Sequence, residues 1–329
     1  MKTECQVLRD VSSSGKIRKW AQYKTSNTYL AEAYESVDNQ KAERLRGCAS
    51  FLDYKRDIEH NGRMKLVTAN FCRVRLCPVC SWRRSLKIYG QMSQILTALN
   101  GLYSYIFLTL TIRNCEDYEL SDHITWLSNS YNYLTRNIDF KRAVHGYFRA
   151  IEVTRNRATG QYHPHIHALL AVKRSYFNSR YYLPQEWWVK RWTDCLSLTA
   201  SALCLSVPDY TPIVDVRKVR PRKTDVGDTG IMNAIAEVSK YAVKSADIIC
   251  YDDWDLTIDT VRTLDQALAG RRLATMGGVI KKKHAELHLS SVDDDSDLLH
   301  ITESDDITAD DDSLLYVWHS GYSEYIRSN

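Results

Sequence analysis

The apolar residues of this chain recur with two periods, and the shorter period predicts strands. Residues 105–112 combine aromatic and β-branched side chains in a run that is typical of a buried strand. Residues 147–154 and 165–172 form two more such runs, and residues 213–219 form a fourth. The segment between the second and third runs contains Gly160 in a polar stretch, which indicates a tight turn. We therefore predict that these two runs form a hairpin.

The longer period predicts helices that alternate with the strands. After Ser81, which we expect to cap a helix, apolar residues recur at Leu86, Tyr89, Met92, Leu96 and Leu99. Similar patterns fill residues 121–139, 185–200, 231–246 and 256–268. This order of elements predicts an α+β protein, in which helices pack against a central antiparallel sheet.

The length and composition are those of an ordinary globular protein. The chain has 329 residues, of which 44% are hydrophobic, and this length allows roughly two domains. We expect a cysteine-rich N-terminal region (1–100), a central domain (101–250), and a helical C-terminal region with an acidic tail (251–329). No run of about 20 apolar residues indicates a membrane span. The first residues lack the apolar core of a secretory signal, so we expect a cytoplasmic protein with reduced cysteines.

The net charge of +4 conceals a strong asymmetry. Residues 291–329 carry eleven acidic side chains and one arginine, which gives this tail a charge of −10 and leaves +14 for residues 1–290. A body this basic suits a polyanionic partner such as nucleic acid, although solubility alone explains part of the charge. We expect the acidic tract within residues 293–312 to be disordered or solvated.

The sequence His163-Pro164-His165-Ile166-His167 carries the first candidate chemistry. In a strand, His165 and His167 point to the same face, and Ile166 points to the other face. Two imidazoles on one face form half of a divalent-metal site. The alternative is a strand that merely carries exposed histidines.

Glu152 is the candidate third ligand, because the hairpin turn sets its partner. If residues 157–160 form a four-residue turn, Glu152 lies directly opposite His165 on the same face. A carboxylate beside two imidazoles completes a three-ligand site with open positions. A shift of one residue in the register would turn Glu152 away.

The segment 231–246 supplies a candidate nucleophile. On a helix, Glu237, Tyr241 and Lys244 fall along one stripe. A tyrosine hydroxyl attacks well only beside a cation, a base or a polarised target. Lys244 could stabilise the developing negative charge, and Glu237 could accept a proton. The alternative is ordinary packing with a salt bridge.

Four cysteines could hold a structural zinc ion. Cys77 and Cys80 have the two-residue spacing of a zinc knuckle, and Cys72 and Cys48 are available as further ligands. The alternatives are ordinary reduced cysteines or a redox pair.

Basic residues near both motifs are candidate DNA contacts. Trp82 and the cations that follow it suit base stacking and phosphate contact, although they also suit a solvated helix start. His163 could support the metal ligands or contact phosphate. The predicted DNA contacts are Arg83, Arg84, Lys87, His163 and Lys240.

The combination of His-hydrophobic-His with a later Glu-x-x-x-Tyr-x-x-Lys resembles the HUH endonucleases. It is similar in particular to the replication initiators of small rolling-circle plasmids of Gram-positive bacteria. Phe107-Leu108-Thr109-Leu110-Thr111 resembles the first strand motif of that family, and residues 72–84 resemble the segment upstream of it. The resemblance covers about residues 45–250. Relaxases carry their tyrosine ahead of the histidines, whereas Tyr241 follows them.

The resemblance implies a fold, a reaction and partners. The fold is the HUH nuclease fold, which is similar to the RNA-recognition motif. Mn²⁺ or Mg²⁺ on His165, His167 and Glu152 polarises a phosphate of single-stranded DNA, and Tyr241 attacks it. The products are a 5′-phosphotyrosine and a 3′-hydroxyl primer, and Glu237 later activates water for termination. The partners are plasmid origin DNA, single-stranded or supercoiled, and a host helicase and polymerase. The oligomeric state stays open.

Two other classes fit the same residues. One is an HUH transposase or mobilisation relaxase, which shares the chemistry and differs in its cellular role. The other is a non-catalytic, zinc-containing protein that binds DNA. The order of the motifs favours the replication initiator.

Overall fold

The computed structural model describes residues 6–12, 15–57, 63–220, 223–224, 227–240, 242–292, 297–299 and 313–328. The chain divides into two compact units. Unit 1 comprises residues 1–87, 248–265 and 295–329, and unit 2 comprises residues 88–247 and 266–294. None of the helices in the described residues is long and apolar enough to cross a membrane. The expected domain boundaries after residues 100 and 250 stay predictions, because units of packing need not coincide with functional domains.

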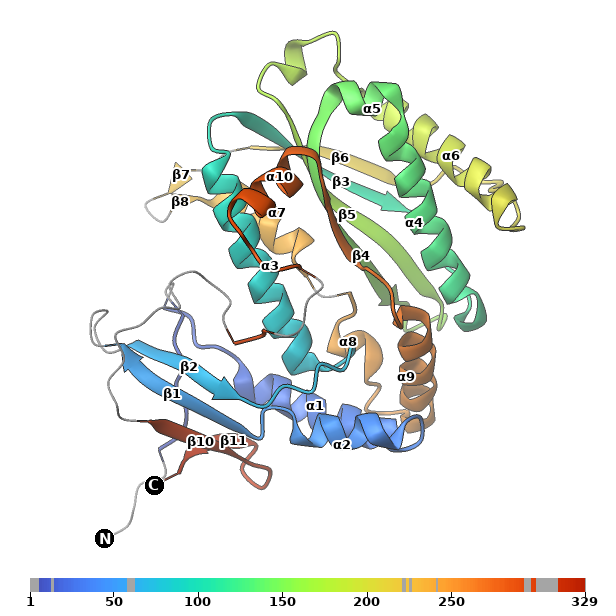
Figure 1. The fold of residues 1–329 in the computed structure, drawn as a ribbon. Helices are drawn as coiled ribbons and strands as arrows, with labels where there is room; N and C mark the ends of the chain where they lie inside the picture. The colour runs from blue at the N-terminus through green and yellow to red at the C-terminus, as the bar shows by residue number, and fades with distance from the viewer. Residues whose placement is uncertain are drawn as a thin grey trace. The chain divides into compact units, whose positions relative to one another are not determined.

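Unit 2 is built on a five-stranded antiparallel sheet with the order β6-β3-β5-β4-β9 (Figure 1). The strands are β3 (Tyr103–Thr111), β4 (Val144–Arg155), β5 (Tyr162–Lys173), β6 (Val214–Val219) and β9 (Ala274–Gly277). Each of the four strands that the apolar pattern predicts lies within two or three residues of its expected position. The remaining strands of the unit form a separate two-stranded sheet, and each has only two residues. They are β7 (Lys223–Thr224) and β8 (Gly227–Asp228).

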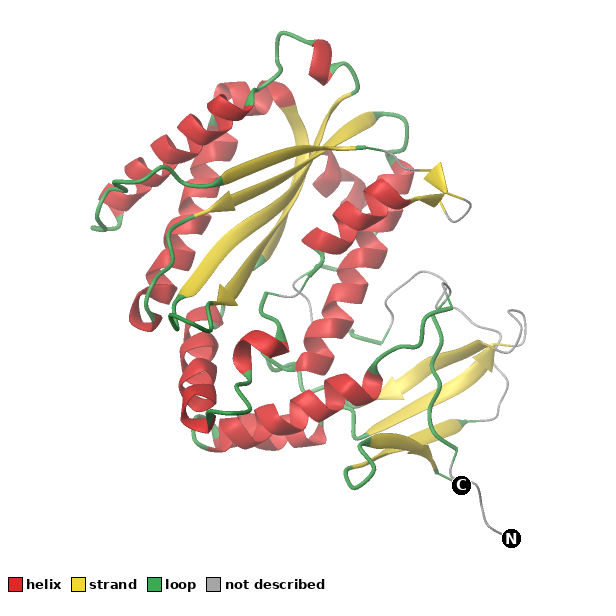
Figure 2. Cartoon of the chain, turned by 180° about the vertical axis from the view of Figure 1, so that it is seen from behind, coloured by secondary structure: helices red, strands yellow, loops and turns green. Residues whose placement is uncertain are grey.

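The chain order β3-α4-β4-β5-α6-β6 is the split β-α-β arrangement of ferredoxin-like folds. Figures 1 and 2 show α4 and α6 on one face of the sheet and α3 and α7 on the other. The predicted α+β class is therefore confirmed. The helices that cover the sheet are α3 (Pro78–Ala98), α4 (Leu120–Arg136), α5 (Ile138–Ala143), α6 (Gln185–Ala202), α7 (Thr229–Val238) and α10 (Gly278–Glu286).

Both faces of the sheet are buried, which explains why its central strands are apolar at nearly every position. On one face, Leu108, Ile166 and Ala168 are fully buried, beneath α4 and α6. On the other face, Phe148 and Leu169 belong to a core cluster that includes residues of α3, α7 and α10. This second face also carries the histidines, so its apolar cover ends where the polar site begins.

The hairpin between β4 and β5 has the register that the sequence predicts. The backbone N–H of Asn156 donates to the carbonyl of Gln161, and this bond closes the turn over residues 157–160. Glu152 is paired with His165 in the resulting ladder. The predicted placement of the carboxylate opposite the first histidine is confirmed.

Unit 1 holds a four-stranded antiparallel sheet with the order β11-β10-β1-β2. Its strands are β1 (Phe51–Asp57), β2 (Arg63–Ala69), β10 (Leu314–His319) and β11 (Glu324–Arg327), and its helices include α1 (Trp20–Glu35) and α2 (Asn39–Gly47). The apolar pattern predicts a helical C-terminal region, whereas the structure has the strands β10 and β11 there. The other described helices are η1 (Asp117–Glu119), η2 (Tyr176–Asn178), α8 (Ser245–Ile248) and α9 (Trp254–Leu268). The acidic tract lies outside the described residues except at 297–299.

Two expected helix boundaries are wrong. α3 begins at Pro78 rather than after Ser81, since proline suits the first turn of a helix, where no N–H donor is needed. α7 ends at Val238 rather than near residue 246. The chain beyond it turns to β4, where the carbonyl of Ala242 accepts from the N–H of Val153 at 2.7 Å. This bond satisfies a strand-edge donor beyond the part of β4 that β9 covers.

Candidate active site and cysteine cluster

The three predicted metal ligands of unit 2 meet at one end of its sheet. His165 and His167 come from β5, and Glu152 comes from the neighbouring β4. One ligand atom from each residue lies within 4.8 Å of the others. The Nε2 atoms of His165 and His167 are 3.6 and 3.3 Å from the same Glu152 oxygen, Oε2. The group is nearly enclosed, because Glu152 is only 5% exposed and His165 8%.

Hydrogen bonds to Nδ1 orient both imidazoles. His165 Nδ1 lies 3.1 Å from the carbonyl of His163, so Nδ1 carries the proton and donates. His167 Nδ1 lies 3.1 Å from Thr109 Oγ1. In this arrangement Nε2 of each ring faces Glu152 rather than its orienting partner, so Nε2 is the nitrogen available to a metal ion. The residues therefore fit a divalent cation, and a set of three protein ligands does not fill the coordination of such an ion.

His163 lies beside this group. Its ring stacks on that of His165, with 5.2 Å between the ring centroids, and its Nδ1 lies 2.8 Å from Asn114 Oδ1. Burial lowers the pKa of His163, and the charge of His165 acts in the same direction. His163 is thus neutral near pH 7, which suits a role in supporting its neighbours more than a role as a fixed cation.

Lys244 forms an ion pair with the carboxylate of Glu152. Its Nζ is 2.9 Å from Glu152 Oε1, the oxygen that does not face the histidines. Burial opposes the ionisation of Glu152, but hydrogen bonds from His165, His167 and Lys244 hold its pKa well below the usual range. The hydrogen bond to Glu152 in turn raises the pKa of Lys244. Glu152 is therefore an anion at neutral pH, ready to bind a cation.

The proposed nucleophile, Tyr241, lies outside the described residues, but the residues on both sides of it lie at the site. Glu237 Oε1 is 3.9 Å from His167 Nε2, and Lys240 forms an ion pair with Glu237. On the other side, Lys244 contacts Glu152. The expected helical stripe is wrong, because α7 ends at Val238. Even so, Glu237 lies at His167 and Lys244 lies at Glu152, and the two residues stand on either side of Tyr241 in the sequence.

The four predicted cysteines form a compact cluster in unit 1. Their sulfur atoms all lie within 4.8 Å of one another, and three Sγ–Sγ distances are 3.6, 3.6 and 3.7 Å. A tetrahedral zinc ion with bonds of about 2.3 Å requires sulfur atoms roughly 3.8 Å apart. The donor set and the spacing therefore fit zinc.

Backbone N–H groups surround the sulfur atoms. Cys72 N–H donates to Cys48 Sγ at 3.4 Å, and Arg73 N–H donates to Cys80 Sγ at 3.3 Å. Arg73 adopts a positive φ of 58°, which turns its N–H toward the cluster. Such donors stabilise negative charge on sulfur, and cysteines need this charge in order to bind a metal ion.

The cations that follow the cysteines are not exposed. Arg83 is 2% exposed, and its guanidinium donates to the carbonyls of Leu298 and Leu299 at 2.8 Å each. Arg84 is 9% exposed and Lys87 2%. Buried cations have little free surface for phosphate, so Arg83, Arg84 and Lys87 are not part of the proposed DNA interface.

Thr109 and Asn114, which orient the imidazoles, were not identified from the sequence. Thr109 is paired with His167 in the ladder of β3 and β5, so a prediction of that register would have found it. Asn114 lies beyond the end of β3, where no pattern indicates its role.

A split β-α-β sheet that presents two histidines and a carboxylate from adjacent strands defines a candidate metal-dependent protein. Comparison with known proteins then shows the family. The model of the replication protein family (Rep_1) matches residues 63–326. The chain belongs to this family, which confirms the resemblance to replication initiators.

Several curated proteins called "Protein rep" are similar over nearly the whole chain. The protein from Bacillus amyloliquefaciens is 39% identical over 97% of both chains. The protein from Lactiplantibacillus plantarum is 35% identical over 91% of both chains. That from Streptococcus pneumoniae is 31% identical over 98% of this chain and 96% of its own. No solved structure matches.

Proposed function

We propose that this protein initiates rolling-circle replication of a plasmid by nicking single-stranded origin DNA with Tyr241. The observation that carries the proposal is the approach of Glu237 and Lys244, from the two sides of residue 241, to the group of His165, His167 and Glu152. Membership of the replication protein family supports the same reading.

The metal site is proposed to hold Mn²⁺ or Mg²⁺ through Glu152 Oε2 and the two Nε2 atoms. When bound, such an ion supplies Lewis-acid polarisation of a phosphate oxygen. The carbonyl of His163 keeps the proton of His165 on Nδ1, and the Thr109 hydroxyl orients the ring of His167. Lys244 holds Glu152 in place through the other oxygen and adds a positive charge where a phosphate would bind.

The proposed reaction is an in-line displacement at phosphorus. The Tyr241 hydroxyl oxygen forms a bond to the scissile phosphorus, and the bond from phosphorus to the 3′ oxygen breaks. The phenol proton passes to a base, for which Glu237 is the candidate, and the departing 3′ oxygen takes a proton from solvent. The products are a 5′-phosphotyrosine and a 3′-hydroxyl that can prime synthesis by host enzymes. Glu237 is also the candidate for activating water at termination.

The test is formation of a covalent adduct between protein and DNA. Single-stranded oligonucleotides that tile the DNA around the coding sequence are incubated with the protein and Mn²⁺, and adducts are resolved by denaturing electrophoresis. We expect one oligonucleotide to yield an adduct that Tyr241→Phe abolishes while DNA binding persists. The matched control is Tyr251→Phe, which alters an exposed tyrosine in unit 1.

Two outcomes would contradict the proposal. If no oligonucleotide yields an adduct with any divalent ion, the protein is a non-catalytic DNA-binding module. If Tyr241→Phe still forms the adduct, another residue is the nucleophile.

We also propose that Cys48, Cys72, Cys77 and Cys80 hold one structural zinc ion. The fit of the sulfur spacing to a tetrahedral site supports this. We expect about one zinc per chain in the purified protein, and the intense visible absorption of a tetrahedral thiolate site after exchange with Co²⁺. Cobalt bound without that absorption would place the ion elsewhere, and a metal-free, folded protein would exclude the site.

A further inference from the structure

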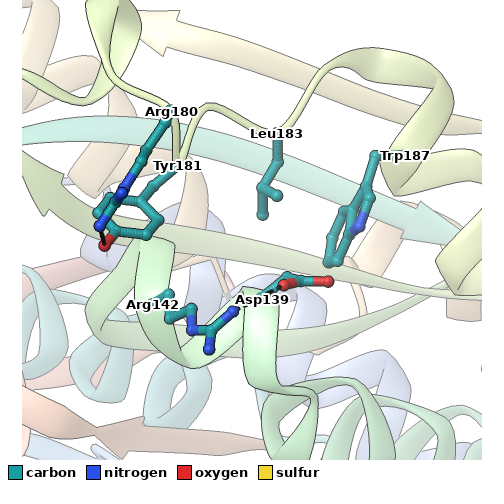
Figure 3. A pocket seen from close by; sticks show the side chains of 6 residues that line it. All are labelled: Asp139, Arg142, Arg180, Tyr181, Leu183 and Trp187. Atoms are coloured by element: carbon teal, nitrogen blue, oxygen red, sulfur yellow. Dashed lines mark hydrogen bonds and ion pairs between the residues drawn. The ribbon is translucent and has the colours of Figure 1, made fainter.

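Unit 2 contains a pocket of about 540 Å³ that is separate from the histidines. Figure 3 shows its side chains arranged around one space. Two come from α5, three from the segment between η2 and α6, and one from the first turn of α6. The lining residues are Asp139, Arg142, Arg180, Tyr181, Leu183 and Trp187.

The pocket is positively charged on two sides. Arg142 belongs to α5, and its side chain is 58% exposed. Arg180 donates to the Tyr181 hydroxyl at 2.8 Å, and its guanidinium carbon lies 4.9 Å from the centre of that ring. This hydrogen bond and the charges of Arg180, Arg142 and Lys173 lower the pKa of Tyr181. The two arginines can thus bind phosphate groups at the rim.

Two aromatic rings offer flat surfaces beside these charges. Tyr181 is 36% exposed. Trp187 is half-buried, and its ring packs at 5.1 Å against Trp188, which is only 1% exposed. Because α6 and Trp188 hold Trp187 in position, stacking of a base on Trp187 costs little conformational entropy. Aromatic faces next to arginines are the usual means of binding bases in single-stranded DNA.

The carboxylate of Asp139 favours a nucleotide over a ligand that consists of phosphate groups alone. This carboxylate lies 3.8 Å from Arg142 Nη1 and lines the same pocket. A carboxylate repels a free polyphosphate, whereas it accepts hydrogen bonds from the amino or imino groups of a base. Leu183, which is 7% exposed, gives the pocket a buried apolar part.

We infer that this pocket binds one nucleotide of single-stranded DNA, with the base against Tyr181 and Trp187 and the flanking phosphates on Arg142 and Arg180. The inference rests on the proposed function. β5 runs from the histidines to Lys173, whose charge acts on Tyr181. The six residues from His167 to Lys173 span about 20 Å. α6 covers the face of the sheet opposite the histidines, so the pocket holds a part of the strand that is separate from the scissile phosphate.

The test is equilibrium binding of a fluorescein-labelled 20-nucleotide single strand of mixed sequence, followed by fluorescence anisotropy over a range of salt concentrations. We expect Tyr181→Ala and Trp187→Ala each to weaken binding by about tenfold, because stacking on one ring contributes about this much. Tyr181→Phe and Trp187→Phe keep an aromatic face and should bind nearly as the wild type does.

The arginines give a different signature. The double variant Arg142→Ala, Arg180→Ala should lower the slope of log affinity against log salt by about 1.4, because each contact with a single strand contributes about 0.7. The aromatic variants should leave the slope unchanged. The controls, Tyr322→Ala and Arg262→Ala, alter exposed residues of unit 1.

Affinities within twofold of wild type for both alanine variants, or an unchanged salt slope for the double variant, would overturn the inference. Failure of the proposed function looks different. In that case the wild type forms no covalent adduct at saturating DNA, while the pocket variants still lose affinity. If the proposed function and the pocket inference are both correct, the pocket variants form the adduct at the wild-type rate once DNA is saturating.

Discussion

At the scale of single residues, the histidines depend on partners that face away from Glu152. His165 is fixed by a backbone carbonyl, which no substitution removes, whereas His167 is fixed by the Thr109 hydroxyl. The two rings therefore differ in how far mutation can disturb them. Thr109 is therefore the residue whose substitution can change the geometry of the site.

Thr109→Val should weaken Mn²⁺ binding by about tenfold, since removal of a group that orients a metal-binding histidine costs 10- to 100-fold in affinity. The substitution keeps the β-branched shape that suits a strand. Isothermal titration calorimetry measures the change, and Thr135→Val, at an exposed hydroxyl on α4, is the control. An unchanged affinity would mean that Thr109 does not orient His167.

Cysteine reactivity should follow burial. Burial raises the pKa of Cys195 to about 12, whereas Cys204 is exposed. Only the thiolate reacts, so at pH 8 iodoacetamide should alkylate Cys204 and leave Cys195 unmodified in the folded protein. Because the pKa of Cys195 is higher in the folded state than in the unfolded chain, its contribution to stability is complete below about pH 8.5 and declines at higher pH. Mass spectrometry of tryptic peptides measures the alkylation of the two cysteines, and early alkylation of Cys195 would contradict the prediction.

At the scale of elements, the sequence predicts what is local. The turn over residues 157–160 sets the register of β4 and β5, so the position of Glu152 follows from the sequence alone. Although proline has no N–H donor, Pro164 does not disturb this pairing. Val153 donates to Ala242, so the pair of Val153 and Pro164 needs no hydrogen bond between the strands, and β3 has ended before reaching Pro164.

Elements whose partners are distant in sequence could not be predicted in this way. α7 ends at Val238 because the following backbone pairs with β4, which lies far earlier in the chain. The site residues beyond that end, Lys240 and Lys244, reach their partners from outside the helix. Their spacing in sequence therefore predicted a helix that ends earlier in the structure, and their roles at the site stay predictions.

The junction of β9 and α10 depends on glycine. Gly278 has a φ of +59°, and a Cβ there would lie 2.1 Å from the carbonyl oxygen of His145. Gly278→Ala should destabilise the protein by more than about 2 kcal/mol, because it adds a backbone clash to an unfavourable φ. Gly270→Ala is the matched control, since Gly270 also has a positive φ but open space around it. Equal shifts of the melting temperature for both variants would contradict the role of the close contact.

At the scale of the whole molecule, the last strands of the chain support the first cysteine of the cluster. The Tyr325 hydroxyl donates to the carbonyl of Ala49 at 2.7 Å, and the N–H of Trp318 donates to the carbonyl of Ser50 at 2.9 Å. Both acceptors directly follow Cys48. β10 and β11 thus hold the backbone that presents this cysteine to the cluster.

Deletion of residues 313–329 should reduce zinc retention while Mn²⁺ binding to unit 2 persists. The deletion exposes the edge of β1 and frees the backbone beside Cys48, whereas the histidines belong to a different unit. Zinc content after dialysis and Mn²⁺ titration measure the two sites separately. Tyr325→Phe tests the single hydrogen bond in the intact chain. Full zinc retention in the truncated protein would show that the C-terminal hairpin is dispensable for the cluster.

Unit 1 contains both early and late parts of the chain, and this has a consequence during synthesis. β1 emerges from the ribosome long before β10, its partner in the sheet, has been translated. Until then, one edge of β1 lacks the neighbour that it has in the finished fold. Unit 1 therefore completes its sheet only once β10 has been translated, and a frameshift just ahead of β10 would disrupt a region built mostly from residues 1–87.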